Sequence, residues 1–200
     1  MIYVVHRVNK TKQLKKIAHN YGVEVDIRSN SSKLIIHHDP FKKGELFENW
    51  LENYNHKFLI INVKEEGLEP FILEKLNKFK IKKFFFLDQS FPFILKYSKE
   101  LSYRSAVRFS EFENIQTPLA ISKYVNWIWI DCFFNTPLNK SVIKKLCEYS
   151  FKTCLVSPEL HGRDPNLDIP WMIKKLNFLK FRPNAICTKY PEIWENHFGY

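Results

Sequence analysis

The stretch GVEVDIRSNSSKLIIHHDP, residues 22–40, has the pattern of a β-hairpin with acidic side chains on one arm and histidines after the other. Two β-rich segments flank a polar Ser-Asn-Ser-Ser turn. Glu24 and Asp26 would point to the same face of the first arm, because side chains alternate along a strand. Pairing about the turn places Asp26 roughly opposite His37 and His38. The stretch therefore predicts a place where carboxylates and imidazoles converge.

Strand-like and helix-like segments alternate along the rest of the chain, which predicts a parallel α/β fold. Apart from the return arm of the hairpin, eight strands are expected, at residues 2–6, 23–28, 58–63, 83–87, 103–109, 127–130, 153–156 and 185–188. The expected helices lie at residues 10–21, 44–54, 68–79, 91–99, 118–123, 139–149 and 165–179. This pattern indicates a compact (β/α)8 TIM barrel with a β-hairpin extension after the second strand. A doubly wound open sheet is the alternative, but the chain has no GxGxxG or Walker loop.

The length and composition predict one globular domain over residues 1–200. The chain is 45% hydrophobic, so it can form a sizeable core, and it has no Gly/Ser-rich or Pro-rich linker. Its longest apolar runs are far shorter than the ~20 residues that span a bilayer, so no membrane span is expected. The N-terminal residues lack the pattern of a secretory signal, which predicts a cytoplasmic protein. The four cysteines show no CxxC spacing and are expected to be reduced packing residues.

The formal net charge of +10 would suit an anionic partner. The lysines of residues 75–80 and 174–180 are spaced as on the solvated faces of amphipathic helices, so no nucleic-acid partner is expected. The basic aromatic stretch at residues 80–86 allows two interpretations. Its phenylalanines belong either to the barrel core or to a surface that associates with membranes.

Polar and charged residues follow nearly every expected strand, at the end where a barrel carries its active site. The candidates are His6, Arg7, Glu24, Asp26, His38, Asn62, Lys64, Arg108, Asp131 and Glu159. Two of them have alternative interpretations. Arg108 is either a buried ion-pair partner or a second anion contact. Glu159 either forms an ion pair with Arg163 in a structured loop or contacts substrate.

The residue types in this set favour phosphate-ester chemistry. Glu24 and Asp26 offer hard oxygen ligands on one face, which suits Mg²⁺ or Ca²⁺ better than zinc. Histidines act as acids and bases near neutral pH, and two of them, His6 and His38, stand among the candidates. Arginine and lysine side chains can hold a phosphate while a metal neutralises the charge that develops on it.

The ordered motifs resemble those of the glycerophosphodiester phosphodiesterase family, within the phosphatidylinositol phospholipase C-like phosphodiesterases. The motifs that carry the resemblance are His6-Arg7, Glu24-Val25-Asp26, His38-Asp39-Pro40, Asn62-Val63-Lys64 and Thr188-Lys189-Tyr190-Pro191. Between residues 87 and 179 only the barrel pattern matches. The resemblance implies His6 and His38 as the acid and base, Arg7 and Lys64 on the phosphate, and a metal held by Glu24 and Asp26.

Three residues depart from the family pattern. Val8 replaces a glycine, Lys189 replaces an acidic residue, and Asn62 stands where a third metal-binding carboxylate is expected. Asn62 can still ligate through its amide oxygen, but one negative charge is lost unless Asp131 or Glu159 compensates. The expected function is metal-dependent hydrolysis of a small-molecule phosphodiester by a divergent member of the family. The alternative is a noncatalytic phosphate-binding or partner-binding barrel, and the oligomeric state stays open.

Overall fold

The computed structural model describes residues 1–198 and confirms the α/β class. Eight parallel strands form the inner layer: β1 (Ile2–Val5), β2 (Gly22–Asn30), β5 (Leu59–Val63), β6 (Phe84–Leu87), β7 (Ala106–Phe109), β8 (Trp127–Ile130), β9 (Lys152–Val156) and β10 (Ala185–Thr188). They pair in the order β6-β5-β2-β1-β10-β9-β8-β7. One isolated parallel bridge, between Phe86 and Ser105, joins the two ends of this order. The amide of Phe86 also donates to the carbonyl of Arg104 at 2.7 Å.

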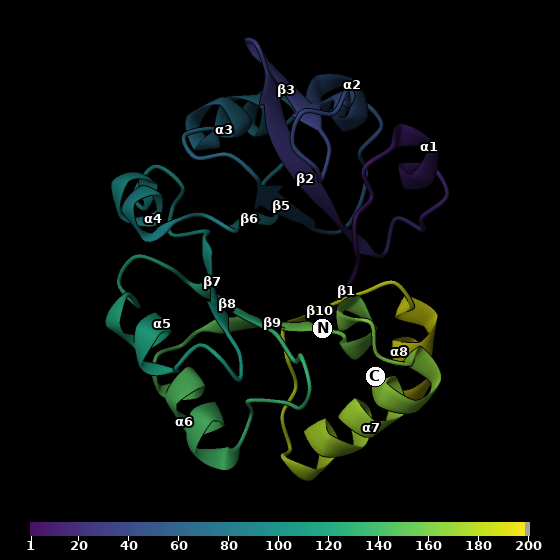
Figure 1. Cartoon of the computed structure of the whole chain (residues 1–200), viewed down its shortest axis with the longest axis vertical. Coiled ribbons are helices and arrows are strands. Elements are labelled where there is room, and N and C mark those ends of the chain that lie inside the picture. Colours follow the sequence, from purple (N-terminus) through teal and green to yellow (C-terminus); the bar gives the residue numbers. More distant parts are fainter. Residues whose placement is uncertain (199–200) are drawn as a thin grey trace.

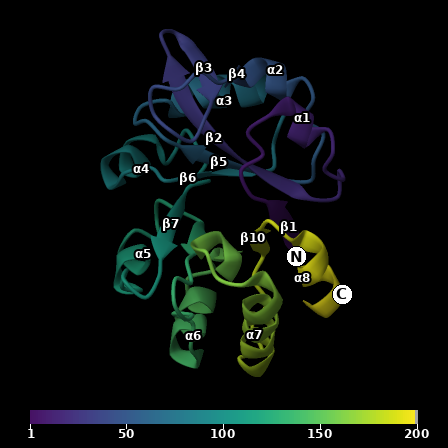
Figure 2. The same ribbon diagram turned by 45° about the vertical axis from the view of Figure 1, so that its right-hand side comes forward.

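Two further strands extend the sheet beyond β2. Strand β3 (Lys33–Ile36) pairs antiparallel with the outer half of β2, from Asn30 opposite Lys33 to Ile27 opposite Ile36. Strand β4 (Glu45–Leu46) pairs antiparallel with β3. The β2–β3 pair projects away from the other strands at the top of Figures 1 and 2.

The helices follow one another around the outside of the strands (Figure 1). They are α1 (Thr11–Leu14), α2 (Phe47–Leu51), α3 (Glu69–Lys78), α4 (Phe91–Tyr97), α5 (Gln116–Ala120), α6 (Lys140–Glu148), α7 (Pro165–Phe178) and α8 (Pro191–Phe198). A 3-10 turn, η1 (Pro158–His161), precedes α7. The last helix was not predicted from the sequence.

Two predicted helices are shorter than expected. Residues 10–21 were predicted as one helix, but only α1 is helical, and separate turns carry the chain to Gly22. Residues 44–54 were also predicted as one helix, but residues 45–46 form β4. A Cβ atom on Gly44 would lie 2.3 Å from the carbonyl oxygen of Ile36, so the backbone runs against β3 before α2 can begin.

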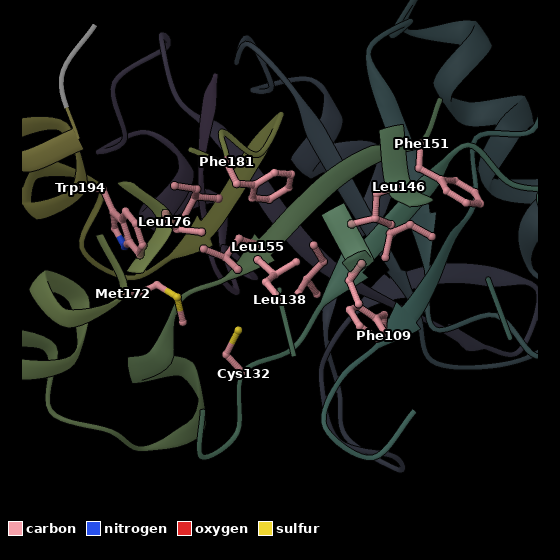
Figure 3. Packing of buried hydrophobic residues seen from close by; sticks show 14 of the residues in the cluster. Phe109, Cys132, Leu138, Leu146, Phe151, Leu155, Met172, Leu176, Phe181 and Trp194 are labelled. Atoms are coloured by element: carbon pink, nitrogen blue, oxygen red, sulfur yellow. The ribbon is translucent and has the colours of Figure 1, made fainter. Parts of the chain in front are cut away.

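Apolar side chains fill the space between the strands and the helices. Figure 3 shows one such cluster, in which Leu155 of β9 packs near Met172 and Leu176 of α7. Trp194 of α8 belongs to the same cluster and is fully buried. These contacts come from the faces of β8, β9 and β10 that point toward the helices.

Alternate residues of the parallel strands point the other way and pack against one another. This inner cluster includes Val4, Ile60, Phe85, Leu87, Ala106, Trp127, Trp129, Cys154, Val156, Ala185 and Cys187. Strand β2 adds no apolar residue to it, because its matching positions are Glu24 and Asp26, level with Ile60 and Asn62 of β5. The inner layer is therefore apolar at the amino ends of the strands and polar toward the carboxyl ends.

The basic aromatic stretch is divided between the core and the surface. Phe84, Phe85 and Phe86 are all buried in β6, so these phenylalanines belong to the core, while Lys80, Lys82 and Lys83 are exposed. Cys132, Cys154 and Cys187 are also buried, while Cys147 is exposed on α6. Within residues 1–198, no helix is both long and apolar enough to cross a bilayer.

Candidate active site

The candidate site lies where the strands end, because the alternation of each strand puts its last inner side chain there. Glu24, Asp26 and Asn62 occupy inner positions of β2 and β5. Arg108 follows Ala106 by two residues, and Asp131 follows Trp129 by two, so they lie on the same face as inner-cluster residues. Every one of these polar side chains except Arg108 is buried.

Glu24 is fully enclosed and both of its carboxylate oxygens accept hydrogen bonds. The backbone amide of Arg7 donates to one oxygen at 2.7 Å, and the amide nitrogen Nδ2 of Asn62 donates to the other at 3.1 Å. Burial and the nearby charge of Asp26 raise the pKa of Glu24 well above its ordinary value. The protonated form of Glu24 is therefore favoured more than in a glutamate exposed to water.

Asp26 is completely buried, and three polar or cationic side chains contact its carboxylate. Asn9 donates to Oδ2 at 2.7 Å and accepts from the backbone amide of Asp26 at 3.0 Å. Lys64 places its ammonium 3.4 Å from Oδ1, and the guanidinium of Arg7 lies 3.9 Å from Oδ2. These contacts compensate a charge that would be costly if it were buried alone.

Arg7 connects the carboxylates with His38. Its backbone has a φ of 53°, which is uncommon for a residue other than glycine and turns the chain at the end of β1. This turn points the Arg7 amide at Glu24, while the guanidinium lies 2.6 Å from Nε2 of His38. The strained backbone is therefore held by the hydrogen bond to a buried carboxylate.

The contacts of His38 define its tautomer. A guanidinium can only donate hydrogen bonds, so Nε2 of His38 accepts from Arg7 and the ring proton is on Nδ1. Nδ1 then donates to the carboxylate of Asp39 at 2.8 Å. Arg28 also holds the carbonyl oxygen of His38, through contacts of 2.9 and 3.1 Å. His38 is thus fixed at its ring and at its backbone.

His6 is more enclosed than His38. Its Nε2 lies 3.9 Å from the carboxylate of Glu24, and its buried Nδ1 has no hydrogen-bond partner. Burial, and then the nearby cations Arg7, Lys189 and Lys64, lower the pKa of His6 to about 3. The imidazole is therefore neutral at pH 7.

This low pKa predicts a pH-dependent stability. Below pH 6.5, the ordinary pKa of histidine, His6 is protonated in the unfolded chain. In the folded chain it stays neutral until the pH nears 3. His6 should therefore remove about 1.4 kcal/mol from the free energy of unfolding per pH unit as the pH falls. His6→Gln carries no such proton, so in EDTA it should gain stability relative to the unmodified protein. Urea unfolding at about pH 7, 6 and 5 measures this difference, and parallel pH profiles would contradict it.

A series of ion pairs begins at Lys64 and continues along the carboxyl ends of the strands. The Lys64 ammonium also donates to Asp88 at 3.2 Å, and Asp88 accepts from Arg108 at 2.6 Å. Arg108 pairs in turn with Asp131 at 2.5 Å. His161 places Nε2 3.1 Å from Asp131 without hydrogen-bond geometry. Arg108 is therefore an ion-pair partner here, and a third of its side chain still reaches solvent.

Glu159 lies apart from this network of contacts. One of its oxygens accepts from Thr188 at 2.7 Å and from the Lys189 amide at 2.9 Å, and the other accepts from Ser157. The predicted Glu159–Arg163 ion pair is wrong, because Arg163 pairs with Asp168. Glu159 thus joins η1 to the end of β10.

Seven of the candidates form one connected group: His6, Arg7, Glu24, Asp26, His38, Asn62 and Lys64. Arg108 and Asp131 reach this group only through Asp88. Neither Asp88 nor Asn9 was assigned a role from the sequence. The position of Asn9, two residues after the His6-Arg7 motif, was a usable signal.

No protein-family model matches the chain, and no curated protein matches it by sequence. Solved structures do match. A glycerophosphodiester phosphodiesterase from Agrobacterium tumefaciens is 10% identical and has a TM-score of 0.66, with 96% of this chain and 97% of that chain covered. The chain has the fold of a glycerophosphodiester phosphodiesterase.

Two other solved structures agree. A glycerophosphoryl diester phosphodiesterase from Parabacteroides distasonis is 11% identical, with a TM-score of 0.66 and coverage of 97% of this chain and 85% of that chain. A calcium-dependent phosphoinositol-specific phospholipase C from Pseudomonas sp. is 10% identical, with a TM-score of 0.51 and coverage of 94% and 88%. The resemblance inferred from the motifs is confirmed at the level of the fold.

The oxygen donors of the candidate site fit a hard divalent cation. Oδ1 of Asp26 and Oδ1 of Asn62 are buried and accept no hydrogen bond, and Glu24 supplies a second carboxylate beside them. The negative charge is low, because Asn62 is neutral and Lys64 lies 3.4 Å from Asp26. Within residues 1–198, no three His, Cys, Asp or Glu side chains are grouped to hold a metal. Such a donor set predicts weak binding.

Proposed function

We propose that the chain is a phosphodiester hydrolase that uses a divalent metal and two histidines to cleave a small-molecule diester. The observation that supports this most directly is the position of Arg7. Its guanidinium lies within hydrogen-bond distance of His38 and 3.9 Å from Asp26, and its amide holds Glu24. One residue with a half-exposed guanidinium thus links an imidazole and a pair of carboxylates.

Arg7 and Lys64 are the proposed phosphate contacts. Almost half of the Arg7 side chain is exposed, so its guanidinium can exchange His38 for a phosphoryl oxygen. Lys64 is less exposed and already bridges Asp26 and Asp88, which fixes its ammonium at the edge of the site. Two fixed cations stabilise the charge that develops on the phosphoryl oxygens during cleavage.

His38 is the proposed general acid and His6 the proposed general base. When a phosphate takes the Arg7 guanidinium, Nε2 of His38 becomes free, and Asp39 at 2.8 Å stabilises the imidazolium form. His38 can then protonate the leaving alcohol. The His6 ring is neutral at pH 7, so it has a lone pair that can accept the proton of a nucleophile, either water or a substrate hydroxyl.

Mg²⁺ or Ca²⁺, held by Glu24, Asp26 and Asn62, would neutralise charge on the phosphoryl oxygens as a Lewis acid. We also propose that the strands form one (β/α)8 barrel domain with a hairpin after β2, over residues 1–200, of which 199–200 lie outside the described part. The bridge between Phe86 and Ser105 supports closure of the barrel rather than a doubly wound open sheet. The cytoplasmic location and the absence of a nucleic-acid partner stay predictions from the sequence.

The alternative is a noncatalytic barrel that binds a phosphate or a partner. Two contacts favour it. The amide N–H of Asn62 donates to Glu24, where a third carboxylate would repel it, and Lys64 lies close to Asp26. Protein groups thus supply part of the positive charge that a metal would bring.

Metal-dependent turnover separates the two functions. We expect slow hydrolysis of bis(p-nitrophenyl) phosphate that rises with added Mg²⁺ or Ca²⁺ and disappears in EDTA. Asn62→Glu adds the missing negative charge and should lower the metal concentration for half-maximal activity by roughly tenfold. Asn139→Glu, on the N-terminal cap of α6, is the control that should leave that concentration unchanged. No hydrolysis of several diesters with any metal would support the noncatalytic barrel.

A further inference from the structure

A cavity of about 710 Å³ lies at the amino ends of the strands. Its lining includes Phe58 and Trp127 and four cationic side chains: Lys57, Lys83, Lys152 and Arg182. This is the end of the inner layer opposite to the candidate active site. Trp127 lines the cavity and Asp131 belongs to the candidate site, and the rise of β8 between these two residues is roughly 13 Å.

The four cations come from separate parts of the sequence. Lys57 precedes β5, Lys83 precedes β6, Lys152 begins β9, and Arg182 precedes β10. Adjacent strand starts bring them together, since Leu59 pairs with Phe84 and β10 pairs with β9. The parallel sheet therefore gathers these charges around one opening.

The fold does not compensate this positive charge. Among residues 1–198, no carboxylate forms an ion pair with any of the four cations. Glu195 is the single carboxylate of the lining, and it accepts a hydrogen bond from the hydroxyl of Tyr21 at 2.6 Å. Arg182 stacks its guanidinium on Phe198, 4.2 Å from the ring centre, and Lys152 lies 5.9 Å from the ring centre of Trp127. The lining thus carries four cationic side chains and one carboxylate, and that carboxylate already accepts a hydrogen bond.

Within residues 1–198, the side chains of Lys57 and Lys83 form no ion pair or ring contact, so packing does not require a cation at either position. All four side chains are exposed, and the strand starts are held by backbone contacts, such as the Lys57 amide donating to Tyr21 and the Leu59 amide donating to Lys83. Any residue but proline would make the same amide contacts. Clustered like charges repel one another, so an anion bound between them would stabilise the folded chain.

We propose that this cavity binds a small polyanion carrying two or more phosphate groups. The cavity has the size of a small-molecule site, and its apolar floor contains Phe58 packed against Trp127 at 5.4 Å between ring centres. Lysine and arginine side chains bind phosphate oxygens through charge-assisted hydrogen bonds. The site is separate from the proposed catalysis and does not depend on it.

Isothermal titration calorimetry with sodium tripolyphosphate and with ATP tests the proposal, and comparing the two probes shows whether a ring adds affinity. We expect one binding site per chain that depends on the cavity lysines, apart from any binding at Arg7 and Lys64. The triple variant Lys57→Ala, Lys83→Ala, Lys152→Ala should weaken binding roughly tenfold or more. The control, Lys12→Ala, Lys140→Ala, Lys174→Ala, removes the same charge from exposed helix positions and should leave the affinity unchanged.

Other results would overturn the proposal. These are equal affinity in both triple variants, or no binding of either probe below about 1 mM. Binding of a polyuridine oligonucleotide or of phosphatidylserine vesicles through the same lysines, without binding of tripolyphosphate or ATP, would also overturn it. Urea unfolding checks that the cavity variant is folded. Its turnover of bis(p-nitrophenyl) phosphate should match the unmodified protein, so failure here is distinct from failure of the proposed hydrolase.

Discussion

His38→Ala should lower the turnover of a phosphodiester by about 10²- to 10⁴-fold, the usual contribution of general acid–base catalysis. The variant loses the imidazole that contacts Arg7 at 2.6 Å and Asp39 at 2.8 Å. The His38 side chain is 38% exposed, so its removal should change the free energy of unfolding little. The measurement is the initial rate with bis(p-nitrophenyl) phosphate at saturating metal, together with urea unfolding.

Two comparisons make this result specific. His197→Ala removes an exposed histidine from α8, whose ring contacts the carbonyl of Ile193, and should keep full turnover. His6→Ala should lose turnover as His38→Ala does, because the two imidazoles serve opposite proton transfers. Full turnover in both His6→Ala and His38→Ala would rule out the proposed roles of the pair.

Trp50→Ala should lower the free energy of unfolding by about 3–5 kcal/mol, as expected for truncating a fully buried aromatic side chain. Trp50 is 0% exposed on α2 and stacks between Phe47 and Tyr54, with ring centres 6.2 and 5.6 Å away. Its Nε1 also donates to the carbonyl of Val8 at 3.0 Å. Urea unfolding followed by circular dichroism measures the loss.

Trp50→Phe is the matched control, because it keeps most of the packing and loses the hydrogen bond. Its cost should be smaller, about 1–3 kcal/mol for a buried carbonyl left without its donor. Val8 directly follows Arg7, so Trp50→Phe should also reduce turnover while the protein stays folded. A variant as stable as the unmodified protein would show that the Trp50–Val8 contact does not hold this loop.

Local pattern in the sequence was enough to predict the α/β class and the strand face that Glu24 and Asp26 share. The period of two along a strand puts Glu24 and Asp26 on one face, and that holds whatever the rest of the chain does. The polar turn between the hairpin arms predicted that His37 and His38 would lie roughly opposite Asp26, and the register puts His37 there. The amide of His37 does donate to the carbonyl of Asp26, at 3.2 Å.

Helix lengths were less predictable, because tertiary contacts overrode local spacing. Residues 10–21 have helical spacing of apolar residues, yet the chain must return to β2, and a Cβ on Gly22 would lie 2.9 Å from the Phe58 carbonyl. Residues near Gly44 likewise follow β3 instead of forming helix. In both cases a close backbone approach decided the conformation.

By itself, the sequence determined which residues share a strand face and which stand at strand ends, because those relations are local. Only the tertiary structure decided which ends meet. It brought Lys64 to Asp88 and Asp88 to Arg108, buried His6 beside Glu24, and separated Glu159 from them. It also gathered four distant cations around one cavity. These contacts join residues far apart in the chain, and their distances depend on how the strands pair and on what the core packs between them.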